Sequence, residues 1–91
     1  MRAPLLPLGR VVATPGALKA LSDAGEHPFC YIAGHATGDW ADLCAHDRRE
    51  NERSLGHGLR VLSSYPIGDR KVWVITEADR SVTTLLLPEE Y

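Results

Sequence analysis

The strand predicted over Val72–Thr76 constrains the fold most, because four successive residues in it are apolar. Successive side chains of a strand point to opposite faces of the sheet, so both faces must be covered, as is typical of a central strand. The segments before and after it, Pro66–Asp69 and Glu77–Arg80, have the composition of turns. Two further β-rich segments, Leu59–Tyr65 and Ser81–Leu87, then complete a three-stranded antiparallel meander.

The N-terminal half has helical signals instead. Thr14 offers an N-cap oxygen and Pro15 suits the first helical position, which predicts a helix ending at Gly25. A second helix is expected from Pro28 to Gly38. Its apolar side has helical spacing and comprises Phe29, Ile32, Ala33 and Ala36.

Three more segments complete the predicted fold. Residues 1–9 form an extended lead-in because their prolines fix φ, and the valine at 11 is compatible with a short fourth strand. Asp47 and Glu50 resemble a capping box that opens a third, highly charged surface helix. The sequence therefore predicts one α+β domain over residues 1–91, with short N-terminal helices packed on the C-terminal meander.

Charge and composition exclude several classes of protein. The net charge of -2 provides no general attraction to nucleic acid or to an anionic membrane. No apolar run is long enough to span a bilayer, and no glycine-rich loop has the spacing that holds a cofactor phosphate. We therefore expect a cytoplasmic protein that contacts no membrane and uses no cofactor.

Four residues have side chains that zinc prefers, namely His27, Cys30, Cys44 and His46. Their spacing matches no common zinc finger, and two cysteines are too few to indicate a disulfide framework. Buried cysteines and surface histidines are the expected alternative. We predict no metal site, although the spacing alone leaves binding at these four residues open.

Whether the chain is an enzyme stays open from its residues. A metal-independent ribonuclease needs a general base and groups that hold the phosphate. His35 is the candidate base, because the end of the second helix favours its cationic form. The remaining catalytic candidates lie in the closing hairpin and are Glu77, Arg80, Thr83 and Thr84. RNA is a partner only under this alternative.

A binding protein is the other interpretation. Trp40 and Tyr91 are aromatic residues of the kind that anchor protein interfaces, and Asp39, Asp79 and Arg80 supply charge near them. An exposed edge or an uncovered face of the short sheet also favours a homodimer or another protein partner.

The last twenty residues carry the most specific pattern, Trp73-x-Ile75-Thr76-Glu77-x-Asp79-Arg80-Ser81-Val82-Thr83-Thr84-x-Leu86-Leu87-Pro88-x-Glu90-Tyr91. Further matching positions are Thr14-Pro15-Gly16-Ala17-Leu18, His35, Gly38-Asp39-Trp40, Asp47 and Asn51. In these segments the chain resembles a family of small uncharacterised bacterial proteins that are often labelled plasmid-related. The resemblance implies an accessory, partner-binding role in mobile elements, with no assigned biochemical activity.

Overall fold

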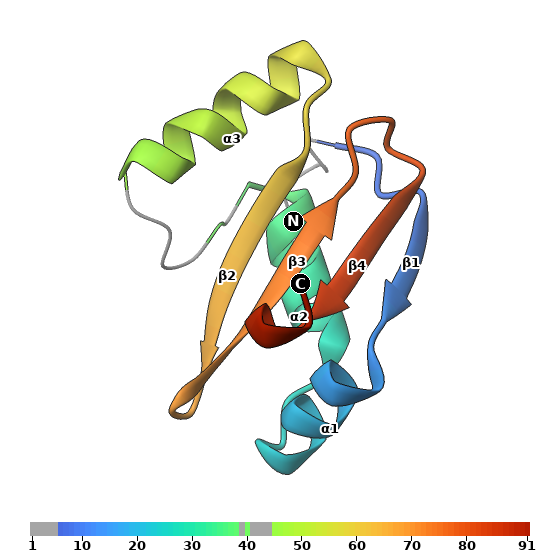
Figure 1. The fold of residues 1–91 in the computed structure, drawn as a ribbon, viewed down its shortest axis with the longest axis vertical. Helices are drawn as coiled ribbons and strands as arrows, with labels where there is room; N and C mark the ends of the chain where they lie inside the picture. Colours follow the sequence, from blue (N-terminus) through green and yellow to red (C-terminus); the bar gives the residue numbers. More distant parts are fainter. Residues whose placement is uncertain (1–5, 39, 41–44) are drawn as a thin grey trace.

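The computed structural model describes residues 6–38, 40 and 45–91. Three α-helices, four strands and a closing turn of 3-10 helix follow one another along this part of the chain (Figure 1). Their order is β1 (Arg10–Ala13), α1 (Pro15–Asp23), α2 (Pro28–Ala36), α3 (Ala45–His57), β2 (Val61–Ile67), β3 (Arg70–Thr76), β4 (Val82–Leu86) and η1 (Pro88–Glu90).

The strands form one mixed sheet in the order β1-β4-β3-β2. The predicted α+β class is confirmed, and β3 lies between β2 and β4 as an antiparallel neighbour of both. A three-stranded antiparallel meander is wrong as a description of the whole sheet, because β1 adds a fourth strand that runs parallel to β4. Sequence periodicity could not show this pairing, since the two strands lie about seventy residues apart.

Gly9 permits the approach of β1 to the turn between β3 and β4. Its φ is +64°, and a Cβ atom there would meet the backbone carbonyl oxygens of Arg80 and Ser81. The next residue, Arg10, donates its backbone N–H to Ser81 at 3.0 Å. Glycine therefore meets both the left-handed conformation and the close contact that the fourth strand requires.

Helices α1 and α2 cover one face of the sheet, with α2 passing behind the strands in Figure 1. The alternating residues that point to them form the main core, which includes Val72 and Val74 of β3 and Leu85 of β4. Helix α1 contributes Ala17, Ala20 and Leu21. Its N-cap is as predicted, because Thr14 Oγ1 accepts a hydrogen bond from the backbone N–H of Ala17 at 3.1 Å.

The opposite face of the sheet lies away from α1 and α2, and we call it the helix-free face. Among the side chains that the strand register places on it are Val12, Leu62, Ser64, Trp73, Ile75, Thr84 and Leu86. The closing turn η1 packs on β3 from this side (Figure 1). The second cover that the apolar β3 was expected to need is therefore supplied in part by the last residues of the chain.

Helix α3 lies along the outer edge of β2 and begins at Ala45, two residues earlier than predicted. The Asn51 side chain pairs with this edge like an added strand: its amide N–H donates to the Leu62 carbonyl, and its Oδ1 accepts from the Leu62 N–H at 3.1 Å. Asn51 is buried. One side chain thus satisfies both backbone groups that Leu62 presents away from β3.

The buried side of α2 matches the predicted one only at Ala36, which is buried as expected. Phe29 is 71% exposed, His35 is buried in its place, and Cys30 is exposed. The apolar spacing through Phe29 and Ile32 indicated the wrong side, because the helix instead turns a histidine toward polar residues of the sheet. This choice determines the chemistry of the interior.

Candidate functional site

His35 lies under the sheet with none of its surface exposed. Its Nδ1 atom is 2.5 Å from Ser63 Oγ in β2, and its Nε2 atom is 2.9 Å from Thr76 Oγ1 in β3. Thr76 Oγ1 lies 2.7 Å from Thr83 Oγ1 in β4, and the Thr83 hydroxyl donates to the Leu8 carbonyl at 2.7 Å. A continuous hydrogen-bonded chain therefore crosses three strands.

The positions of the protons in this chain follow from its fixed end. Thr83 uses its one hydroxyl proton on the Leu8 carbonyl, so the Thr76 hydroxyl must donate to Thr83. Nε2 of His35 must then donate to Thr76 Oγ1, and the neutral ring leaves Nδ1 to accept from Ser63. The network thus selects the neutral tautomer protonated at Nε2.

Burial, and to a smaller extent the nearby positive charge of Arg80, lower the pKa of His35 to about 4. The expected stabilisation of the cation by the end of α2 is therefore outweighed by the loss of water around the ring. His35 is neutral at pH 7 and has no surface on which RNA could approach it. These properties fit a structural role better than that of a general base.

Arg80 spans three backbone carbonyls instead of presenting its guanidinium to solvent. It donates to Leu59 at 2.6 Å, to Ser54 at 3.1 Å and to Glu77 at 3.2 Å. Its backbone has φ of 61°, in the left-handed region. The side chain ties the β3–β4 turn to the end of α3, and three of its five N–H donors are used on backbone carbonyls instead of being free for phosphate.

The other hairpin candidates separate across the sheet. Thr83 is fully buried in the His35 network, whereas Thr84 points to the helix-free face. Glu77 is exposed at the end of β3. Asp79 accepts hydrogen bonds from the N–H and hydroxyl of Ser81, which lower its pKa. Of the proposed catalytic group, the structure therefore joins only His35 and Thr83.

The two predicted aromatic anchors differ in exposure. Trp40 is 4% exposed and packs in a second core cluster with Leu6 and Val61, so little of it is accessible to a partner. Tyr91 is 59% exposed. Asp39, the third residue expected on this surface, lies outside the described residues.

A hollow of about 220 Å³ opens beside Tyr91 on the helix-free face. Ile75 and Leu86 contribute buried apolar side chains to it. The other residues that line it are Arg60, Glu77, Thr84, Glu90 and Tyr91. Three of the predicted residues, Glu77, Thr84 and Tyr91, come together in its lining.

Tyr91 is held in place from two sides. Its ring meets Trp73 edge to face at a centroid separation of 5.8 Å. The Arg60 guanidinium carbon lies 5.1 Å from the ring centroid, and this residue also donates to the Tyr91 hydroxyl. These contacts orient an aromatic side chain that still exposes most of its surface.

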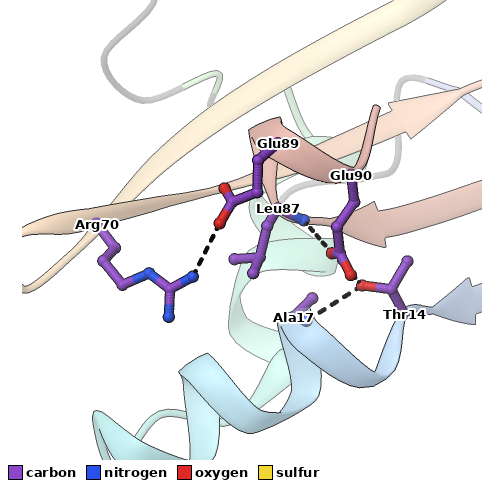
Figure 2. A network of polar contacts seen from close by, with 6 residues as sticks. All are labelled: Thr14, Ala17, Arg70, Leu87, Glu89 and Glu90. Carbon is purple, nitrogen blue, oxygen red and sulfur yellow. Dashed lines mark hydrogen bonds and ion pairs between the residues drawn. The ribbon is translucent and has the colours of Figure 1, made fainter.

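The turn that carries Tyr91 is clamped to α1 and β3, as Figure 2 shows. Glu90 Oε1 accepts from the Thr14 hydroxyl at 2.6 Å and from the backbone N–H of Leu87 at 2.8 Å. These bonds hold the pKa of Glu90 below its usual range. Glu89 pairs with Arg70 at 3.1 Å. The position of the hollow is therefore fixed by contacts between residues that are far apart in the sequence.

The four possible zinc ligands do not form a described site. His27 Nδ1 accepts from the Phe29 N–H at 3.1 Å as the N-cap of α2. Cys44 lies outside the described residues, and within residues 6–38, 40 and 45–91 no three His, Cys, Asp or Glu side chains are grouped to hold a metal. None of the described helices is long and apolar enough to cross a membrane.

Sequence reasoning missed Ser63, Thr76 and Arg60. Ser63 and Thr76 stand at inward positions of strands whose other inward residues are apolar, which was the available signal for a buried polar network. Arg60 precedes β2 and had no such signal, because its contacts depend on where the last residue of the chain lies.

Comparisons with models of protein families, with characterised proteins and with solved structures find no match. What the chain does must therefore be inferred from its own geometry.

Proposed function

We propose that the chain is a small partner-binding protein that uses the hollow beside Tyr91 on its helix-free face. The observation that carries this proposal is an aromatic side chain that is 59% exposed although Trp73 and Arg60 orient it. Preorganised aromatic residues beside apolar pockets contribute most to protein interfaces, because little conformational freedom is lost on binding.

The lining of the hollow indicates the chemistry of the partner. Ile75 and Leu86 offer apolar surface to one inserted side chain. Glu77 is exposed at the rim and makes no ion pair within the described part of the chain, whereas Arg60 already lies over Tyr91. The partner we infer is a protein segment with an apolar residue next to a lysine or arginine, which would pair with Glu77.

An accessory role in mobile elements agrees with a binding function and is supported only by the sequence resemblance. The ribonuclease alternative has weaker support, because its candidate base is buried and neutral and its candidate phosphate ligand Arg80 bonds three carbonyls. An accessible base within reach of the phosphate would be required for catalysis.

Selection from a random peptide library tests the binding proposal while the natural partner is still unidentified. Wild-type protein should enrich peptides in which an apolar residue neighbours a basic one. Their affinity should fall about tenfold or more for Tyr91→Ala, since truncating an interface anchor costs this much. Leu59→Ala is the matched control, because Leu59 is 49% exposed and does not line the hollow.

The charge of the partner is tested with Glu77→Gln, which keeps the shape of the side chain. Affinity for the selected peptides should fall, and its dependence on salt should weaken, because one ion pair is lost. Peptides that bind Tyr91→Ala as tightly as the wild type would refute the proposed surface. Equal, background-level RNA cleavage by wild type and His35→Ala would exclude the ribonuclease alternative, whereas cleavage lost only in the variant would support it.

A further inference from the structure

The outer edge of β1 presents unpaired backbone groups. β1 ends the sheet, and within the described residues no strand pairs with its far side (Figure 1). Arg10 and Thr14 donate their N–H groups toward β4, to Ser81 and Leu85, both at 3.0 Å. Because N–H groups alternate in direction along a strand, those of Val11 and Ala13 point outward, with their carbonyls. This edge is complementary to an extended backbone.

An apolar groove of about 410 Å³ accompanies the edge. It is formed by β1 and by the beginning of α2, where Phe29 is 71% exposed. Val11 is 45% exposed beside it. Within Arg10–Ala13 no proline or bulge interrupts the edge, and Arg10 is its one charged residue. Backbone groups and apolar side chains are thus exposed together.

We propose that a second copy of this chain occupies the edge, with the two β1 strands paired antiparallel about a two-fold axis at Val12. Val11 of each copy then lies opposite Ala13 of the other, and the two pairs exchange four backbone hydrogen bonds. Each pair sets a larger side chain against a smaller one. The result is one continuous sheet of eight strands, with each Phe29 over the junction.

Charge complementarity favours a second copy over an unrelated strand. In this register Arg10 lies opposite Thr14 of the second copy, and Thr14 holds the Glu90 carboxylate at 2.6 Å. Arg10 makes no ion pair within the described part of its own chain. The symmetry therefore brings Arg10 beside Glu90 of the second copy twice, with no like charges opposed. The dimer edge and the hollow at Tyr91 share only Glu90, which also lines the hollow. The β1 substitutions used below change no residue of the hollow, so the two proposals can be tested separately.

Sedimentation equilibrium of the wild type and Val11→Pro tests the dimer. The wild type should reach twice the 10.0 kDa chain mass as concentration rises. Proline at position 11 removes an outward N–H and none of the bonds to β4, so the variant should fold as a monomer. Leu59→Lys alters a residue of similar exposure that precedes β2 at the other edge, and it should still dimerise. A wild type that stays monomeric would overturn the proposal.

Disulfide trapping tests the register even if Val11→Pro fails to fold. In the Cys30→Ser, Cys44→Ser background, Val12→Cys should give a covalent dimer on mild oxidation. The two Val12 residues form a non-hydrogen-bonded pair with Cα atoms about 4.5 Å apart, which a disulfide can span. Arg10→Glu should weaken the non-covalent dimer most at low salt. Covalent dimers that form with Leu59→Cys but not with Val12→Cys would show that the two copies pair through another surface.

Discussion

Acid should lower the free energy of unfolding of this protein through His35, because the burial of its ring disfavours the protonated form. The pKa is about 4 in the fold against 6.5 for an ordinary histidine. Between these values the unfolded chain binds the proton and the native chain does not, so stability falls as pH falls. A pKa difference of one unit corresponds to about 1.36 kcal/mol. The free energy of unfolding should therefore fall by about 2 kcal/mol at pH 5 and by at most roughly 3.4 kcal/mol well below pH 4.

Urea unfolding followed by tryptophan fluorescence from pH 7.5 to 5 measures this loss. The window above pH 5 avoids most of the titration of carboxylates such as Glu90, whose pKa is lowered and whose stabilisation disappears at more acid pH. His35→Asn removes the titrating ring and should flatten the pH dependence, at the cost of lower stability at pH 7. His57→Asn alters an exposed histidine and should leave the slope in place.

Direct titration of the ring by NMR keeps the test independent of how well the variant folds. The native His35 ring should show a midpoint near 4 and the tautomer protonated at Nε2. A midpoint near 6.5, or an unchanged pH dependence of unfolding in His35→Asn, would refute the account of a buried neutral histidine.

Three substitutions test the remaining contacts by urea unfolding. Asn51→Ala should cost about 1–3 kcal/mol, since both backbone groups of Leu62 lose their partner; a loss near zero would show that water replaces it. Gly9→Ala should cost clearly more than Gly25→Ala, because both have positive φ but only Gly9 meets backbone atoms; equal losses would contradict the close contact. Arg80→Lys keeps the charge and should still lose about 1–2 kcal/mol, because one ammonium nitrogen replaces the two guanidinium nitrogens that together reach the three carbonyls.

The strands and helices that local sequence determines were predictable. The four successive apolar residues of β3 predicted a central strand, because both of its faces need cover. In the sheet β3 does lie between two other strands. Thr14 and Pro15 start α1 as expected, because capping depends on residues within one turn. Periodicity carries this information, since it reflects the geometry of a single element.

Long-range relations were not predictable from the same signals. The pairing of β1 with β4 and the clamp of Glu90 on Thr14 join residues more than seventy positions apart. His35 looked like a helix-end histidine, and only the inward serine and threonines of distant strands make it a buried, neutral hydrogen-bonding group. The burial of Trp40 and the exposure of Tyr91 likewise depend on residues far away in the sequence.

The most direct test of the binding account is an NMR titration of the wild type with a peptide selected on it. Amide shifts should concentrate on β3, β4 and the closing turn around Ile75, Leu86 and Tyr91, and the Tyr91→Ala variant should show them only at higher peptide concentration. Shifts confined to other surfaces, or equal binding by the variant, would contradict the claim that this face carries the function.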